Sequence, residues 1–191
     1  MPSDVVVTIP GLLSREECAA EIDRAEGLGF GEAPITTERG FVRAPEVRNN
    51  TRVMRDDPRQ ASLIWSRLCS HTPPTLPGWS AVGLNERFRL YRYTPGQYFR
   101  THRDGCFARS SSEQSQLTLL IYLNEEFTGG ETLLLDWGRV RPQTGLALIF
   151  SHRMLHESVA LRSGRKYVLR SDVMYSRRES ESIAASAVTK Q

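Results

Sequence analysis

The sequence lacks the features of a membrane-spanning, secreted or disulfide-stabilised protein. No stretch approaches the roughly eighteen apolar residues that a transmembrane helix needs. The N-terminus has neither the basic segment nor the long apolar core of a signal peptide. The three cysteines, Cys18, Cys69 and Cys106, are odd in number and form no CxxC pair, which argues against a disulfide framework or a zinc knuckle. These absences predict a cytoplasmic protein without a membrane anchor.

The sequence also lacks a long block of one charge. Its formal net charge is only +3, and the arginines are scattered along the chain. A nucleic-acid-binding domain usually concentrates its basic residues on one face, so we do not expect nucleic acid as a partner. The apolar fraction of 39% and the charged fraction of 25% are ordinary for a globular protein. The length of 191 residues suits one domain with a substantial core, and nothing in the composition indicates an oligomeric state.

Helix signals are confined to the first part of the chain. A capping-box pattern at residues 14–17 predicts the start of a helix that stops near Gly27 or Gly29. The pair Asp57-Pro58 places a capping residue before a proline at the first helical position and predicts a second helix. From about residue 86 onward, short β-runs alternate with turns, which indicates an antiparallel sandwich or jelly roll.

Two of the four histidines stand at spacings that suit a metal site. His102 and Asp104 are two residues apart in a run typical of an extended strand, so their side chains should face the same side. His156 follows the apolar run 146–150, which is typical of a buried strand. Two histidines and one carboxylate are the donor set of a non-haem Fe(II) site that keeps coordination positions open. We predict that His102, Asp104 and His156 bind one Fe(II).

Lys166 offers a positive charge beside this predicted site. It begins a run rich in β-formers after the turn signal at residues 163–164. We expect this strand to pair antiparallel with the strand carrying His156, which would bring the ammonium group near the metal and let it hold a dicarboxylate co-substrate. Arg170 lies on the same strand face. It could bind the co-substrate or a substrate carboxylate, and a structural ion pair is the alternative.

Four segments together resemble, in order and spacing, the catalytic domain of Fe(II)/2-oxoglutarate-dependent oxygenases, and most of all the prolyl 4-hydroxylase-like branch: residues 89–104, 117–124, 127–132 and 164–170. The resemblance covers roughly residues 86–176. It implies a mainly β protein with N-terminal helices packed against the major sheet of a double-stranded β-helix, that is, a cupin-like jelly roll. The metal would lie in its open mouth.

The resemblance also predicts how the chain is divided. We expect a single oxygenase domain over residues 1–176, in which residues 1–85 supply helical support and the substrate rim. Residues 86–176 would form the catalytic jelly-roll core, and residues 177–191 a flexible tail.

The reaction implied by the resemblance is hydroxylation of an unactivated C–H, with Fe(II) as cofactor, 2-oxoglutarate and O₂ as co-substrates, and ascorbate as a stimulant. Lys166 would hold the distal carboxylate of 2-oxoglutarate. A coordinating Asp104 favours hydroxylation over halide transfer, because halogenating enzymes of this type have a non-coordinating residue there. The implied substrate is a peptidyl proline or another protein side chain. A free amino acid or other small molecule is the alternative substrate, and a non-catalytic jelly-roll binding module is the alternative of another class.

Further side chains are assigned to the pocket by the same resemblance. Tyr93 and Tyr122 are expected to line the 2-oxoglutarate pocket, and each could instead be a core aromatic with a satisfied hydroxyl. Tyr91 lies on the same strand face as Tyr93 and is the alternative to it. The paired glycines at residues 129–130 are expected to serve the fold by allowing a tight turn.

The segment of residues 40–52 is polar and lacks periodicity. Loops of this kind are often functional in a compact domain, and in the resembling enzymes this region folds over the mouth of the site. We predict a mobile lid or rim in which Arg43, Asn49 or Arg52 contacts the substrate. A plain surface turn is the alternative.

Overall fold

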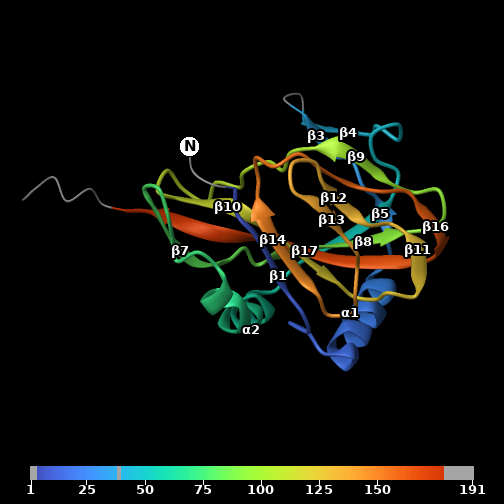
Figure 1. Cartoon of the computed structure of the whole chain (residues 1–191), viewed down its shortest axis with the longest axis horizontal. Coiled ribbons are helices and arrows are strands. Elements are labelled where there is room, and N and C mark those ends of the chain that lie inside the picture. The colour runs from blue at the N-terminus through green and yellow to red at the C-terminus, as the bar shows by residue number, and fades with distance from the viewer. Residues whose placement is uncertain (1–3, 38–39, 179–191) are drawn as a thin grey trace, which may run out of the picture.

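Two antiparallel β-sheets face each other in the structure, and two α-helices lie against the outer side of the larger one (Figure 1). The computed structural model describes residues 4–37 and 40–178. Within those residues the larger sheet has nine strands, which run in the order β1 (Val6–Ile9), β14 (Ala147–Ser151), β10 (Glu113–Tyr122), β17 (Lys166–Arg177), β8 (Arg87–Tyr93), β5 (Thr51–Asp56) and β2 (Gly31–Glu32), with β7 (Trp79–Leu84) paired to β17 and β6 (Thr75–Leu76) paired to β7.

The smaller sheet carries two of the predicted metal ligands. Its strands run in the order β13 (Gly138–Val140), β12 (Thr132–Leu134), β15 (His156–Ser158) and β9 (Phe99–His102). Two further pairs of strands are β11 (Phe127–Gly129) with β16 (Leu161–Gly164), and β3 (Ile35–Thr37) with β4 (Gly40–Val42). The predicted jelly roll, mainly β with N-terminal helices, is confirmed.

Each face of the larger sheet has its own core, because successive side chains of a strand point to opposite faces. On strand β10, Leu119 and Ile121 belong to the core that the helices cover. Tyr122 and the partly buried Leu120 belong to the core between the two sheets. The polar side chains of the candidate site lie at the edge of this second core, so the helices support the sheet from behind and do not reach the site.

Both helices form where their capping signals predict. Helix α1 spans Arg15–Leu28, has the full capping box, and ends at Gly29, whose φ of 82° suits a residue without a side chain. Helix α2 spans Pro58–Leu68, with the Asp57 carboxylate accepting a hydrogen bond from the Gln60 amide, and a 3₁₀ turn, η1, follows at Cys69–His71.

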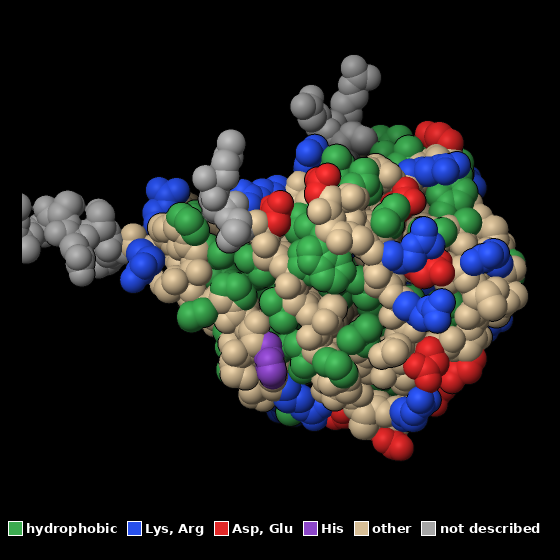
Figure 2. Space-filling model, viewed as in Figure 1, with side chains coloured by type: hydrophobic (Ala, Val, Ile, Leu, Met, Phe, Trp, Pro, Cys, Tyr) green, Lys and Arg blue, Asp and Glu red, His purple; other side chains and the backbone are tan. Residues whose placement is uncertain are grey.

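The described surface carries mixed charge. On the face shown in Figure 2, Lys and Arg side chains are interspersed with Asp and Glu rather than gathered in one stripe. None of the helices in the described part of the chain has the length and apolar character needed to cross a bilayer.

Residues 1–85 contribute more than helices and a rim. Strands β1, β2, β5, β6 and β7 from this part of the chain all join the larger sheet. Periodicity did not reveal them, since β5 is partly exposed along its length and shows no strict alternation of burial. At the other end, β17 continues through Arg177, so the expected tail does not begin there. The rest of that tail, from residue 179 on, lies outside the described residues.

The expected pairing of the Lys166 strand was wrong. Strand β17 pairs with β10, β8 and β7 in the larger sheet. His156 does not end the apolar strand β14; it begins β15 in the smaller sheet, after a turn. A jelly roll sends successive strands to opposite sheets, so Lys166 approaches the site across the sandwich and not along a neighbouring strand.

Candidate active site

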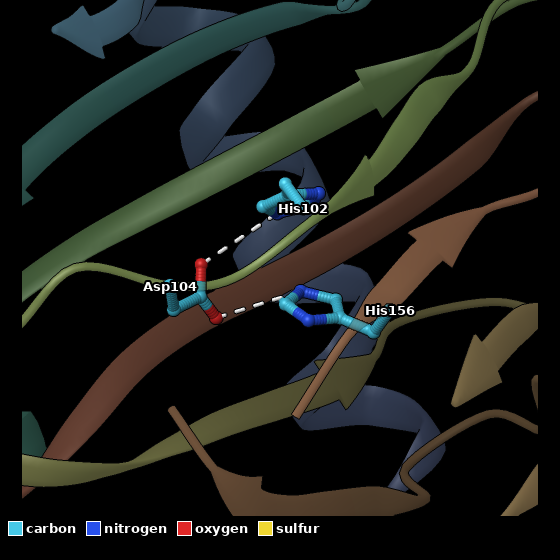
Figure 3. Close-up of side chains that lie close together, drawn as sticks. All are labelled: His102, Asp104 and His156. Carbon is cyan, nitrogen blue, oxygen red and sulfur yellow. Dashed lines mark ion pairs between the residues drawn. The ribbon is translucent and has the colours of Figure 1, made fainter. Parts of the chain in front are cut away.

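The three predicted metal ligands meet at one end of the sandwich. His102 is the last residue of β9, and the β-register pairs it directly with His156, the first residue of β15. Asp104 follows two residues after β9, in a loop rather than on the strand that the sequence predicted. Its Oδ1 lies 3.7 Å from His102 Nε2, and its Oδ2 lies 3.5 Å from His156 Nε2 (Figure 3). One ligand atom from each residue lies within 4.8 Å of the other two.

Backbone contacts orient both imidazole rings. The Nδ1 of His102 lies 2.7 Å from the Arg100 carbonyl oxygen, and the Nδ1 of His156 lies 3.1 Å from the Met154 carbonyl oxygen. A carbonyl can only accept, so a neutral imidazole there carries its proton on Nδ1 and turns the Nε2 lone pair toward Asp104. Phe99 also stacks on His102, with ring centroids 3.5 Å apart.

The Asp104 carboxylate is buried but held in its charged form. It pairs with the Arg170 guanidinium at 3.0 Å and accepts a hydrogen bond of 2.5 Å from the Thr118 hydroxyl. Burial would raise the pKa of this carboxyl, but Arg170 and the two site histidines lower it well below its usual range. The Thr118 oxygen also lies 2.9 Å from Nδ1 of the buried His152, so a hydrogen-bond chain supports Asp104 from behind.

This donor set fits Fe(II). Burial lowers the pKa of His156 to about 4, although Asp104 opposes the shift, so its imidazole is neutral at physiological pH, as a metal ligand must be. Two imidazole nitrogens and one ionised carboxylate then face a common point. A 2-His-1-carboxylate arrangement leaves coordination positions open for other ligands.

Lys166 lies on the same pocket with its charge uncompensated. Its side chain is 1% exposed, and its Nζ donates to the Gly130 carbonyl at 2.5 Å and to Ser158 Oγ at 2.9 Å. No carboxylate among the described residues forms an ion pair with it. Burial lowers the pKa of Lys166 to about 7, and the more distant Glu131 only partly opposes this. A buried ammonium without a counter-ion is costly, so the pocket suits an anionic guest.

Two tyrosines stand beside this ammonium. The Nζ of Lys166 lies 4.9 Å from the ring centroid of Tyr93 and 5.7 Å from that of Tyr122. The Tyr122 hydroxyl donates to Thr132 at 2.7 Å, so part of its hydrogen-bonding capacity is already used. Tyr91 faces the other end of the pocket, where its hydroxyl accepts from Arg170 at 3.4 Å. The geometry therefore puts Tyr93, and not Tyr91, next to Lys166.

Arg170 lies away from Lys166. Besides Asp104, it contacts the Asp172 carboxylate at 3.2 Å. Of the alternatives that the sequence left open, these contacts favour the structural ion pair, with Arg170 orienting a predicted metal ligand. The sequence did not reveal this partnership, because Arg170 and Asp104 are far apart in the chain and lie in different parts of the fold.

Gly130 supports the Lys166 pocket through its backbone. Its φ is +69°, and a Cβ added there would lie 2.9 Å from Leu161 Cδ1 and 3.2 Å from Lys166 Cδ. The turn at residues 129–130 therefore serves the fold, as the sequence predicts, and also leaves room for the lysine stem.

The segment of residues 40–52 divides into three parts. Residues 40–42 form β4, and residues 51–52 begin β5 in the larger sheet, so neither part is a free lid. The loop between them is tied to β9, since the Val47 carbonyl accepts from the Arg100 amide at 2.8 Å. This loop therefore lies beside the site, and its role as a substrate rim stays a prediction.

The three predicted substrate contacts in this segment differ in their surroundings. Arg43 is exposed and pairs with Glu32 at 2.9 Å. The Asn49 side chain accepts from the Tyr98 amide at 2.8 Å, which is a structural role. Only Arg52 lines the mouth shared with His102 and Asp104. Sequence reasoning missed Arg48, which is buried in the same mouth.

Comparisons with known proteins agree with this geometry. The sequence profile described as the 2OG-Fe(II) oxygenase superfamily matches residues 88–171, which include all three predicted metal ligands and Lys166. A putative prolyl 4-hydroxylase from Acanthamoeba polyphaga mimivirus is 34% identical over 102 residues, which cover 44% of this chain and 42% of that protein. An uncharacterized fowlpox virus protein is 32% identical over 102 residues, covering 53% of this chain and 24% of that protein. The chain thus spans less than half the length of these curated relatives.

Solved structures share the fold along most of the chain. A viral collagen prolyl hydroxylase from Paramecium bursaria Chlorella virus-1 superposes with a TM-score of 0.62 at 22% identity, covering 90% of this chain and 96% of that one. A Trichoplax adhaerens prolyl hydroxylase, solved with a peptide fragment of hypoxia inducible factor, superposes with a TM-score of 0.67 at 17% identity, covering 88% and 82%. A Pseudomonas putida prolyl-4-hydroxylase gives 0.61 at 19% identity, covering 91% and 93%. At these identities the likeness concerns the fold.

Proposed function

We propose that the chain is a 2OG-Fe(II) oxygenase of the prolyl 4-hydroxylase-like branch and that it hydroxylates a prolyl residue of a protein or peptide. Members of this family use Fe(II), 2-oxoglutarate and O₂. The observation that carries the proposal is the single pocket onto which the 2-His-1-carboxylate cluster and the uncompensated Lys166 both open. A metal and a dicarboxylate have complementary partners there, a short distance apart.

In this proposal His102, Asp104 and His156 hold Fe(II), and Lys166 holds the distal carboxylate of 2-oxoglutarate by a charge-assisted hydrogen bond. When bound, the iron supplies the redox chemistry that couples the decarboxylation of 2-oxoglutarate to oxygen transfer. One oxygen atom of O₂ enters the substrate C–H as a hydroxyl group. The other enters succinate, and CO₂ leaves.

The side chains around these ligands keep the site prepared for that reaction. Arg170 and Thr118 keep Asp104 charged and orient its carboxylate, which would ligate the metal and thereby disfavour halide transfer. The rings of Tyr93 and Tyr122 exclude water from the Lys166 ammonium, which strengthens its bond to a carboxylate. The rim next to β9 lies where a substrate would enter.

The test is succinate formation from 2-oxoglutarate by the purified full chain with Fe(II), O₂ and ascorbate, in the presence of proline-containing peptides. The expected result is that a peptide gains the mass of one oxygen atom and that succinate is formed along with it. His156→Ala should abolish both signals, and His71→Ala, which alters an exposed histidine far from the site, should not.

Other outcomes identify other functions. An oxygen gained by a free amino acid and by no peptide would replace the peptidyl substrate with a small molecule. Fe(II) and 2-oxoglutarate binding without succinate, in the presence of every candidate substrate, would indicate a non-catalytic binding module.

A further inference from the structure

Five arginines converge on the mouth of the pocket, at the end opposite Lys166. They are Arg48, Arg52, Arg89, Arg103 and Arg170, and the same mouth is lined by His102 and Asp104. Arg89 and Arg170 are neutralised, because Arg89 pairs with Asp172 at 3.1 Å and Arg170 is shared between Asp104 and Asp172. Arg103 is exposed and donates to the Arg153 carbonyl at 2.7 Å, so solvent screens its charge. This leaves Arg48 and Arg52, whose charge needs another explanation.

Arg48 is buried with part of its guanidinium unsatisfied. Its Nε donates to Asn50 at 2.7 Å, and its planar group lies between two rings, 4.4 Å from the centroid of Tyr91 and 4.5 Å from that of Phe99. One terminal nitrogen, Nη2, has no hydrogen-bond partner in the described structure although it is shielded from solvent. A buried donor without a partner is unfavourable, so stacking alone does not account for an arginine here.

Arg52 is the second unneutralised arginine. It lies on β5 directly opposite Tyr91 in the β-register, so both side chains point from the larger sheet toward the smaller one. No carboxylate among the described residues pairs with Arg52 or with Arg48.

The arginines create a positive electrostatic potential in this mouth, which shifts the pKa values of Arg52 and Tyr91. Burial lowers the pKa of Arg52, and Arg48, Arg89 and Arg170 lower it further. Burial would raise the pKa of Tyr91, but Arg170, Arg48 and Arg89 together bring it down to about 8. A bound Fe(II) would add two further positive charges next to these groups.

This positive mouth is distinct from the Lys166 end of the pocket. Lys166 and Arg170 are four residues apart on β17, a separation of about 13 Å along a strand. The β-register pairs Lys166 with Tyr93, and Val168 with Tyr91, which itself pairs with Arg52. The candidate metal ligands lie between the two cationic ends, so a co-substrate held by Lys166 does not neutralise Arg48 and Arg52.

We propose that Arg48 and Arg52 form a carboxylate-binding subsite that selects substrates carrying a negative charge close to the hydroxylated carbon. This inference rests on the proposed function and deepens it by naming the substrate class. An acidic side chain next to a peptidyl proline supplies this carboxylate, and so does the free carboxylate of an amino acid. The chemistry is the same in both cases, and the experiment separates the two sources.

The experiment measures binding by calorimetry to the full chain with Fe(II) and 2-oxoglutarate under anaerobic conditions. One arm uses short proline peptides in matched pairs, with Glu or Gln on either side of the proline. The other arm uses free L-proline and L-prolinamide. A charge-assisted hydrogen bond predicts that the carboxylate member of the selected pair binds roughly tenfold to a hundredfold more tightly, and the arm in which this occurs identifies the source.

Variants then assign the preference to the arginines. Arg52→Gln should remove most of the preference for the carboxylate ligand, and Arg48→Met should remove the rest of that preference. Arg52→Glu should invert it toward peptides with Lys beside the proline, which a merely destabilised protein cannot do. Arg24→Gln makes the same charge change on helix α1, behind the larger sheet, and should leave the preference intact.

Two results would overturn the subsite: no charge preference in either arm, or a preference that persists unchanged in Arg52→Gln. Failure of the proposed function would look different. In that case no succinate would form under any condition, whereas carboxylate binding would still depend on Arg52.

Discussion

Replacing Lys166 with Met should separate co-substrate binding from folding. The wild-type side chain is 1% exposed, and burial lowers its pKa from the ordinary value of 10.5 to about 7. At about 1.4 kcal/mol per unit, that shift corresponds to roughly 5 kcal/mol of unfavourable free energy for the buried ammonium at acidic pH. The substitution removes this cost and gives up the hydrogen bonds to Gly130 and Ser158, which contribute roughly 1–3 kcal/mol together.

The protein without co-substrate should therefore melt no lower as Lys166→Met than as wild type. The affinity for 2-oxoglutarate should meanwhile fall roughly tenfold to more than a hundredfold, because a charge-assisted bond to a carboxylate is lost. Thermal melting and anaerobic calorimetry measure the two quantities independently. Arg165→Met is the matched control, since it removes a positive charge at the neighbouring, exposed position and should leave the affinity unchanged.

The pH dependence supplies a second check on the same lysine. Its folded pKa lies below its unfolded pKa, so between pH 7 and 10.5 the folded protein holds fewer protons, and the stability of wild type should rise with pH through this window. Below about pH 7 the full cost of the buried charge is present. Binding of 2-oxoglutarate requires Lys166 in its charged form. The affinity of wild type for 2-oxoglutarate should therefore weaken by up to about tenfold for each pH unit above 7.

Lys166→Met should lose this pH dependence of co-substrate affinity. An unchanged apparent KM for 2-oxoglutarate in this variant, combined with a lowered melting temperature, would refute the reasoning and make Lys166 a structural residue.

Three further substitutions test the rest of the site. His156→Ala should abolish succinate formation and sharply weaken Fe(II) binding in an anaerobic titration; retention of both would exclude it as a ligand. Thr118→Val keeps the shape of a buried side chain but removes a hydrogen bond to the predicted carboxylate ligand, so Fe(II) affinity should fall by about tenfold to a hundredfold. Thr72→Val, which removes a buried hydroxyl directly after the 3₁₀ turn, should not change that affinity, and equal effects of the two substitutions would contradict the argument. Gly130→Ala should raise the KM for 2-oxoglutarate, because the new Cβ would press on the Lys166 stem, whereas Gly138→Ala, also at positive φ but with no atom within 4 Å of the new Cβ, should not.

Much of this protein could be predicted from local patterns. The capping box at Ser14 and the Asp57-Pro58 pair are complete within one turn of chain, so the helix starts followed directly from them. The spacing of His102 and Asp104 indicated that the two side chains lie together, but the strand argument behind it was wrong, because Asp104 lies in the loop after β9. Shared motifs then indicated the jelly roll and its chemistry.

Contacts that depend on two distant segments were decided only by tertiary structure. The approach of Lys166 to the site was predicted, but with the wrong strand as its neighbour. Strand β17 lies in the larger sheet beside β8 and β10, so the Lys166 side chain reaches the site from the sheet opposite β15. The bond between Arg170 and Asp104, and the stacking of Arg48 on Phe99, leave no periodic trace in the sequence. The two side chains of such a pair come into contact only after the chain has folded, so the residue types alone do not specify which side chains will interact.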